Sequence, residues 1–316
     1  MTAPFAAALC CLLLQPDPAA LIPLYQQALA EREKELGPQH PKLARLASDF
    51  GLFHRKNGNP DAARPLFRRA LEIDARHLGP TNRITAEDLE NLASVSSPEE
   101  AIALQRRAAL CDDAGVAARN LAAIGAWEVA HKNRERALTF YQQALAKEQA
   151  ASGENHPRFA VRLNDLALLL DPAQAEPLLR RALTVQESAL GPLHPEVAVT
   201  LNNLANVLLA KEQPAEAERA ARRSLTILEQ GLGASHPRVA TAASNLADIL
   251  LARQDLAAAR QLYERALRID EKFYGLSHPE VAVDLENLAA LLDRMGRKQE
   301  AAQHRARAAR IKASAQ

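Results

Sequence analysis

Apolar side chains recur at three- and four-residue steps along most of the chain. In the segment that begins at Pro195, one such stripe consists of Val197, Leu201, Leu204, Ala205 and Leu208. This spacing places the side chains on one face of an amphipathic helix. After a break at residues 211–214, a second stripe is formed by Ala217, Ala220, Ala221, Ser224, Leu225 and Leu228. The pattern therefore predicts two helices joined by a short turn.

Most of the remaining chain consists of imperfect copies of residues 191–233. The His-Pro pairs that begin at His194, His236 and His278 lie 42 residues apart, and further pairs begin at His40 and His156. A glycine precedes each pair by three residues, and Asn82 takes the histidine place in one copy. Glycine can end a helix in a left-handed conformation, and proline at the first helical position gives up no useful donor. Each G-x-x-H-P therefore predicts a turn between two helices.

The second helix of each copy has small residues at two fixed places, seven residues apart. Small side chains allow helix backbones to approach closely, so we expect partner helices to touch there. Phe67, Tyr141 and Tyr263 follow the first small place by four residues, and we expect them to fill the gap to a neighbouring repeat. The small residues are Ala63, Ala101, Ala137, Ala175, Ala217, Ala259 and Ala301 at the first place, and Ala70, Ala108, Ala144, Ala182, Ser224, Ala266 and Ala308 at the second.

The order G-x-x-H-P, LNNLA, EAE and RAL resembles the tetratricopeptide repeat, in particular its longer kinesin light chain type. The resemblance covers nearly the whole chain. It implies an all-α, right-handed superhelical solenoid of about eight stacked helical hairpins, with a concave groove lined by the first helix of each repeat. We expect one domain over residues 1–316, with a degenerate first repeat at 1–37, shortened repeats at about 82–156 and a C-terminal capping helix at 298–313.

Polar side chains stand eight or nine residues past most repeat markers, beside the buried Leu-Ala of the same helix. Asparagine suits peptide binding because its amide donates and accepts hydrogen bonds at once. The resemblance places this surface in the groove, which predicts a ladder that binds a peptide segment. The alternative is that these groups only satisfy inter-helix contacts or solvate a face. The predicted peptide-binding residues are Ser48, Asp49, Glu90, Asn91, Asn164, Asp165, Asn202, Asn203, Asn206, Ser244, Asn245, Asp248, Glu286 and Asn287.

Acidic side chains outnumber basic ones along this predicted groove, which favours a ligand with cationic character. The acidic groove neighbours are Asp49, Glu90, Asp165, Asp248 and Glu286, against Arg45 and Arg119. The C-terminal segment is basic instead: seven Lys or Arg side chains between Arg294 and Lys312 accompany Glu300 alone as an acid. A solubilising end cap is one interpretation of this cluster, and an anionic docking site is the other.

The whole chain is nearly neutral, with 39 basic and 38 acidic residues, and gives no reason to expect a nucleic acid or an anionic membrane as partner. Cys10, Cys11 and Cys111 lack metal or disulfide spacing. The marker histidines, one per repeat, cannot converge on one ion. We expect no metal, cofactor or catalytic site, because no motif for one is present.

The apolar run near the N-terminus has two interpretations. Residues 4–15 have the length of a signal h-region but no basic residue precedes them, and the run falls in phase with the repeat as a truncated first helix at about 3–15. The second interpretation, together with the cysteine usage, favours a cytoplasmic protein, and the first an exported one. No stretch is long enough for a membrane span.

These patterns lead to two hypotheses of different classes. The first is a non-catalytic adaptor that binds a peptide segment of a partner protein in the groove. The second is a structural or self-associating array that uses its convex or terminal faces and leaves the groove empty. Oligomeric state and partner identity stay open.

Overall fold

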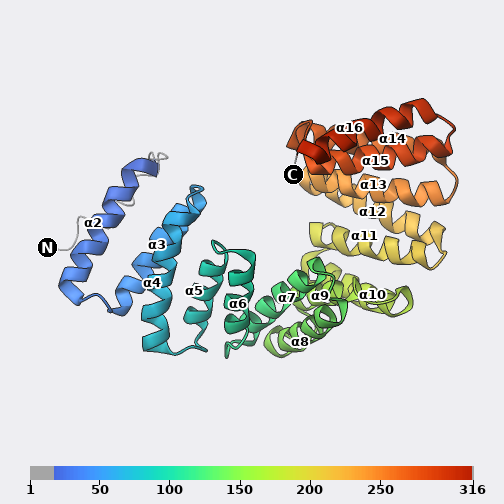
Figure 1. The fold of residues 1–316 in the computed structure, drawn as a ribbon. Coiled ribbons are helices and arrows are strands. Elements are labelled where there is room, and N and C mark those ends of the chain that lie inside the picture. Colours follow the sequence, from blue (N-terminus) through green and yellow to red (C-terminus); the bar gives the residue numbers. More distant parts are fainter. Residues whose placement is uncertain (1–17, 315–316) are drawn as a thin grey trace. The chain divides into compact units, whose positions relative to one another are not determined.

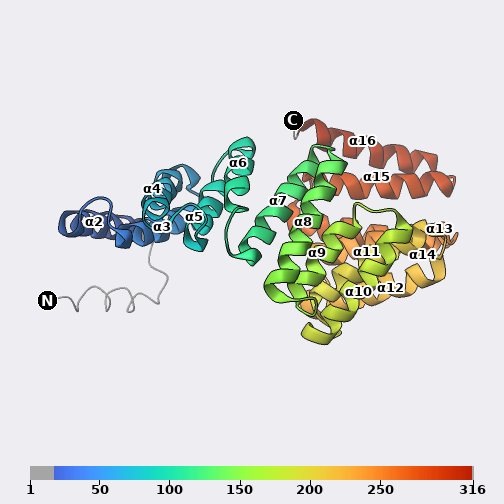
Figure 2. The same ribbon diagram turned by 90° about the horizontal axis from the view of Figure 1, so that it is seen from below.

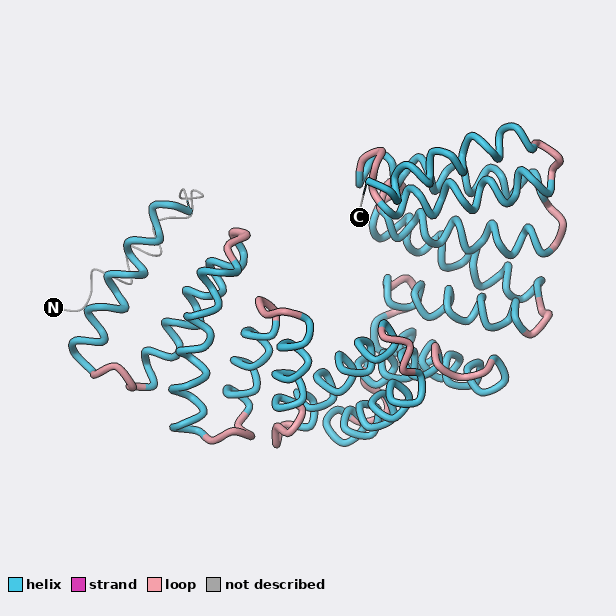
Figure 3. The backbone as a smooth tube through the Cα atoms, viewed as in Figure 1, coloured by secondary structure: helices cyan, strands magenta, loops and turns pink. Residues whose placement is uncertain are grey.

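Every secondary-structure element in the described part of the chain is an α-helix. The structure is a computed structural model, and it describes residues 18–314. Short loops join the helices (Figure 3). The expected helix at about 3–15, with Cys10 and Cys11, lies outside the described residues.

First and second helices of successive hairpins alternate along the chain, as the repeat pattern predicts (Figure 1). They are α2 (Pro18–Leu36), α3 (Pro41–Lys56), α4 (Pro60–Leu78), α5 (Arg83–Ala93), α6 (Pro98–Ala108), α7 (Ala114–Ala130), α8 (Arg134–Ser152), α9 (Pro157–Ala167), α10 (Pro172–Leu190), α11 (Pro195–Ala210), α12 (Pro214–Leu232), α13 (Pro237–Ala252), α14 (Leu256–Tyr274), α15 (Pro279–Arg294) and α16 (Lys298–Ser314).

The chain divides into two compact units, residues 1–151 and 152–316. In the first unit, α3 pairs with α4 and α5 with α6, and α4 packs on α5. In the second unit the pairs are α9/α10, α11/α12, α13/α14 and α15/α16, and each pair packs on the next. Both views show α15 beside the capping helix α16 (Figures 1 and 2). The predicted all-α solenoid of stacked hairpins is confirmed, and a single domain over residues 1–316 stays a prediction.

The marker histidines cap the helices that follow them. In each of the five His-Pro copies, the ring Nδ1 accepts a hydrogen bond from the backbone N–H two residues later, at 3.1–3.3 Å. Asn82 does the same with its side-chain oxygen, which lies 2.9 Å from the backbone nitrogen of Ile84. The first backbone donors of a helix have no partner within it, so these caps satisfy one of them.

The marker glycines end the preceding helices in a backbone conformation that differs from the one we expected. Gly233 has φ 85° and ψ 151°, and Gly79 has φ 92° and ψ 162°. The ψ values place these residues in an extended region with positive φ, rather than in the left-handed helical region. Only glycine adopts this region readily, so a residue with a side chain is strained there.

We expect Gly233→Ala to lower the free energy of unfolding by about 1–3 kcal/mol through backbone strain alone. A Cβ atom at Gly233 would meet no other atom within 4 Å, so no steric clash contributes. Gly231 provides the matched control, because it lies inside α12 and its added Cβ would contact only Pro195, at 3.5 Å. Gly231→Ala should raise the stability by about 0.5–1 kcal/mol. Denaturant unfolding followed by circular dichroism would test both, and equal effects would contradict the assigned strain.

The small residues of the second helices lie at buried helix contacts. Ala63, Ala182 and Ser224 have no exposed surface, whereas Ala101 in the shortened repeat is partly exposed. Phe67 shares a core cluster with Ala86 and Leu89 of the next repeat, as expected, and it also packs inside its own hairpin. A Cβ atom at Gly51 would lie 2.6 Å from the ring of Phe67, which belongs to the same hairpin. The ring thus packs between α3 and α4, because glycine on the facing helix leaves room for it.

Candidate functional site

The predicted groove residues all lie on the first helices of their hairpins. They occupy α3 and α5 in the first unit, and α9, α11, α13 and α15 in the second. Asn164 and Ser244 are buried, Asp49, Asn206, Asp248 and Glu286 are exposed, and the others are partly buried. Each unit thus carries one part of the set, placed at the edge of the buried stripe.

In the second unit, side-chain hydrogen bonds connect α9 to α11. The Asn164 amide nitrogen donates to the hydroxyl of Thr200 at 2.7 Å, and this hydroxyl donates to Gln186 on α10 at 2.5 Å. Asn203 donates to the side-chain oxygen of Asn164 at 3.2 Å. Asn164 is 7% exposed, so most of the hydrogen-bonding capacity of its amide is used within this cluster. Its role is to join adjacent repeats, as the alternative interpretation of the polar ladder proposed.

Related contacts join first helices elsewhere. In the first unit, Ser48 donates to Asp88 and accepts from Asn91, both at 3.5 Å. Glu90 accepts from Asn120 at 2.6 Å and pairs with Arg119 at 3.2 Å. In the second unit, the hydroxyl of Ser244 lies 3.5 Å from Asp284. The residues eight places past a marker therefore serve mainly as connections between repeats.

Other amides keep hydrogen-bonding capacity. Asn206 is exposed, and Asn245 and Asn287 are partly buried with no side-chain hydrogen bond to the described residues. The side-chain oxygen of Asn202 is buried and has no partner within residues 18–314. The amides of Asn203, Asn206, Asn245 and Asn287 can reach a ligand, whereas the buried oxygen of Asn202 cannot.

Two pockets contain predicted groove residues. In the second unit, Asn203 and Asn206 line a pocket of about 190 Å³ whose other walls include Leu168, Leu170 and Val207. Leu168 is 66% exposed. In the first unit, a pocket of about 470 Å³ lies between α3, α4 and α5 and is lined by Pro41, Arg45, Ser48, Asp49, Leu52, Asp74, Leu78, Ile84, Glu87, Asp88 and Asn91.

Most of the acidic groove neighbours already have partners. Asp165 lies 2.7 Å from Arg162, and burial raises its pKa although the arginine opposes the shift. Asp248 is exposed as a residue, but its carboxylate accepts a hydrogen bond from the hydroxyl of the buried Tyr263, and the loss of hydration there raises its pKa although the hydrogen bond opposes the shift. Glu286 pairs with Lys312 at 2.7 Å. Asp49 is exposed and forms no hydrogen bond or ion pair within the described chain, so the attraction for a cation concentrates in the pocket of the first unit.

Two buried carboxyl pairs were not among the predicted site residues. Asp74 on α4 faces Asp88 on α5, and Asp270 on α14 faces Asp284 on α15. Burial and the neighbouring carboxylate raise the pKa of Asp88 to about 8 and that of Asp284 to about 7. The members of each pair lie 14 residues apart in the sequence, at the same repeat places. That recurrence of aspartate at buried places is the signal that could have revealed them.

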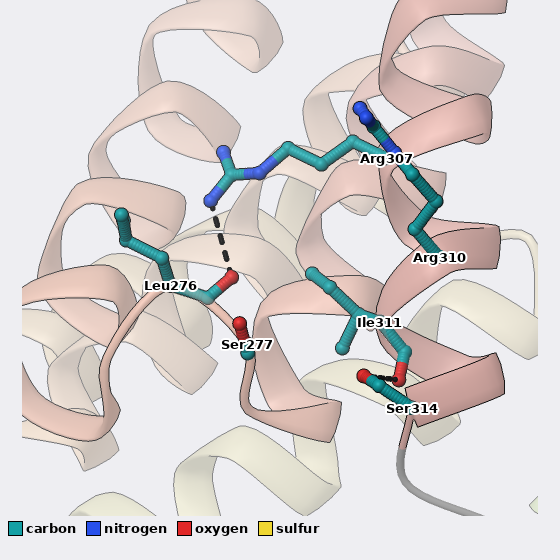
Figure 4. A pocket seen from close by; sticks show the side chains of 6 residues that line it. All are labelled: Leu276, Ser277, Arg307, Arg310, Ile311 and Ser314. Carbon is teal, nitrogen blue, oxygen red and sulfur yellow. Dashed lines mark hydrogen bonds between the residues drawn. The ribbon is translucent and has the colours of Figure 1, made fainter.

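A further pocket, of about 530 Å³, lies beside the capping helix (Figure 4). Arg307 extends across it and donates to the backbone oxygen of Leu276 at 3.3 Å, while its other nitrogen pairs with Glu271 at 2.5 Å. Arg305 pairs with Asp293, and Arg297 with Glu300. Because most of these cations hold acids of their own unit, the contacts favour the end-cap interpretation over an anionic docking site.

No group of three or more His, Cys, Asp or Glu residues within residues 18–314 is arranged to hold a metal ion. Among the helices that the structure describes, none has the length and apolar character needed to cross a membrane.

A family model described as tetratricopeptide repeat matches residues 7–76, 164–230 and 238–314, more than half of the chain. The chain therefore belongs to the tetratricopeptide repeat family. Proteins with such repeats generally mediate protein–protein interactions and are typically non-catalytic scaffolds. No curated protein matches the chain.

Three solved structures illustrate the relationship. BtubC (BKLC) from P. vanneervenii is 24% identical, with a TM-score of 0.57 over 72% of this chain and 91% of that one. A Rap protein complexed with Competence and Sporulation Factor is 14% identical, with a TM-score of 0.61 over 87% and 77%. Repeats of a putative kinesin light chain from Podosopora anserina are 19% identical, with a TM-score of 0.41 over 74% and 98%. These likenesses concern the fold, and the predicted tetratricopeptide repeat family is confirmed by the family model.

Proposed function

We propose that this protein is a non-catalytic adaptor that binds a peptide segment of a partner protein along the first helices of its repeats. The observation that carries the proposal is the pocket of the second unit, where Asn203 and Asn206 stand beside exposed apolar walls. An amide next to a small apolar recess can pair with a peptide backbone while the recess takes a side chain.

The side-chain hydrogen bonds between repeats divide the predicted ladder into two groups. Asn164, Ser48 and Ser244 join adjacent repeats and keep the first helices in register. Asn203, Asn206, Asn245 and Asn287 supply the contacts to the peptide. Family membership supports this reading, because tetratricopeptide repeat proteins generally act by binding other proteins.

Replacing Asn203 and Asn245 together by alanine should weaken peptide binding by about tenfold or more, because each lost hydrogen bond contributes about 0.5–1.5 kcal/mol. Peptides selected from a random display library against the full chain would serve as probes, with affinities measured by fluorescence anisotropy. Circular dichroism should show unchanged helicity.

Gln261→Ala is the matched control, since it removes an exposed amide from the second helix α14. Its affinity for the selected peptides should equal that of the wild type. If the double variant also binds these peptides as the wild type does, the amides do not form the site. A failure to select any peptide would favour the rival hypothesis of a structural array.

A further inference from the structure

The pocket between α3, α4 and α5 combines a carboxylate interior with aliphatic walls. Asp74 and Asp88 are buried at 7% and 4% exposure, whereas Asp49 is exposed and Glu87 is partly exposed. The walls include Leu52, Leu78 and Ile84, and the last two are exposed for 41% and 48% of their surface. Arg45 is the one cationic lining residue, against four carboxyl groups.

Ser48 is the one hydrogen-bond donor to Asp88 in the described chain, and its contact is long. Oδ2 of Asp88 is buried without a hydrogen-bond partner in the described chain, and Oδ1 has only the long 3.5 Å contact to Ser48. Two ionised carboxylates only accept hydrogen bonds, so a proton or a cation must lie between them. Burial and the charge of Asp74 raise the pKa of Asp88 to about 8, which means that the empty pocket keeps the proton.

The fold does not need acids at these places. In the second unit, the repeat that begins near His194 has Gln186 and Thr200 at these places, and they form a neutral cluster with Asn164 through hydrogen bonds of 2.5 and 2.7 Å. The repeat that begins near His278 has the second acid pair, Asp270 and Asp284, instead. The neutral cluster satisfies its own donors and acceptors. An acid pair in the same position costs stability, because each buried charge loses its hydration. A ligand whose positive charge pairs with the carboxylates would offset this loss of stability.

The shape of the pocket indicates the kind of cation. Lysine and arginine carry an aliphatic stem that lies along apolar walls and a charged head that reaches an acid. Leu52, Leu78 and Ile84 offer such walls. Within residues 18–314 no cluster of three or more metal-ligating side chains occurs, so the pocket does not supply the several ligands that a divalent metal ion requires.

We infer that this pocket is the subsite for a lysine or arginine side chain of the bound peptide, whose charged group takes the place of the proton shared by Asp74 and Asp88. The inference rests on the proposed peptide-binding function. It gives the ligand a positive charge at one defined position, on the first unit of the protein.

Binding is then linked to pH. In the free pocket one proton is shared by the pair; on binding, the cation enters and the proton leaves to the solvent, so charge is conserved at the pair. The other groups that face the pair are Arg45, Ser48 and Asp49 from α3, His77 from α4 and Glu87 from α5. His77 is held by a 2.8 Å contact to the backbone oxygen of Gln39.

The experiment uses N-acetyl-lysine methylamide and N-acetyl-arginine methylamide as probes, with N-acetyl-glutamine methylamide as the neutral match. Their affinities for the full chain are measured by NMR titration at pH 6.0 and 8.5. The glutamine probe should bind about tenfold or more weakly than either cation, because a charged hydrogen bond is lost. Affinity for both cations should rise by about tenfold per pH unit while one proton is displaced.

Two variants make the test specific. Asp88→Asn keeps the shape and removes the displaced proton, so it should weaken the cationic probes and abolish the pH dependence. Asp49→Asn changes only an exposed rim acid, and it should weaken binding while the protein stays folded. Glu72 is an exposed acid on α4, the helix that carries Asp74. Glu72→Gln should leave the affinities of all three probes unchanged.

Equal binding of the lysine, arginine and glutamine probes at pH 8.5, or no binding of any, would overturn the inference. Unchanged affinities of the cationic probes for the Asp88→Asn variant would also overturn it. Because Asn203 and Asn245 lie in the other unit, their double variant should bind the lysine probe normally. Loss of the peptide site and loss of the cation subsite are therefore separate results.

Discussion

Phe67→Ala is expected to lower the free energy of unfolding of the first unit by about 3–5 kcal/mol. The side chain has no exposed surface and packs with Ala63, Leu71, Ala86 and Leu89 in the core of this unit. Removing the ring loses its transfer energy and leaves a cavity between α3 and α4, since a stacked hairpin collapses only partly into the space.

Gly51 makes this prediction sharper. In the wild type, Gly51→Ala would place a Cβ atom 2.6 Å from the Phe67 ring, and such overpacking costs about 1–3 kcal/mol. In the Phe67→Ala background, the same methyl group fills part of the cavity and should recover stability. The sign of the effect of Gly51→Ala should therefore reverse between the two backgrounds, which is a coupling that only residues in contact show.

Tryptophan fluorescence can follow this unit alone, because Trp127 is the single tryptophan of the chain and lies on α7. Urea unfolding monitored by this signal gives the stability of the four proteins of the cycle. Phe67→Leu is the control, and it should cost less than Phe67→Ala because less volume is lost. Additive effects of Gly51→Ala and Phe67→Ala would show that the ring and the glycine are not in contact.

The repeat was predictable from the sequence because its signals are local. A glycine, a histidine and a proline within five residues determine one turn, and the apolar spacing determines the buried face of each helix. The tight contact between Gly51 and Phe67 could not be derived in this way. It depends on how the two helices of one hairpin pair, whereas only the packing of the aromatic ring toward the next repeat was expected.

The candidate site was predictable only in outline. The amide residues were found by their position in the repeat, but their division into connecting and available groups depends on contacts between residues about 40 places apart, such as Ser48 and Asp88. The buried pair of Asp74 and Asp88 was missed because aspartate on an amphipathic helix normally indicates the solvated face. Recurrence at Asp270 and Asp284 was the available signal.

The same pair predicts an unusual dependence of stability on pH. Burial and the Asp74 carboxylate raise the pKa of Asp88 from 3.8 to about 8 in the folded state. Between these values the folded protein binds more protons than the unfolded chain, so stability contributed by this group falls as pH rises. The contribution is fully present below pH 3.8 and is lost as the pH passes about 8.

Asp88→Asn should remove this dependence, because the amide resembles the protonated acid at every pH. At pH 8.5 the variant should be more stable than the wild type, with the midpoint of the Trp127 transition higher by several degrees if about 1–2 kcal/mol is recovered. At pH 4.5 the two proteins should have nearly equal stability. Asp49→Asn, which changes an exposed acid of the same pocket, should leave the pH profile almost unchanged. A wild type that is more stable than Asp88→Asn at pH 8.5 would mean that the carboxylate pair is already held by a donor, and both the proton and its displacement by a cation would then have to be abandoned.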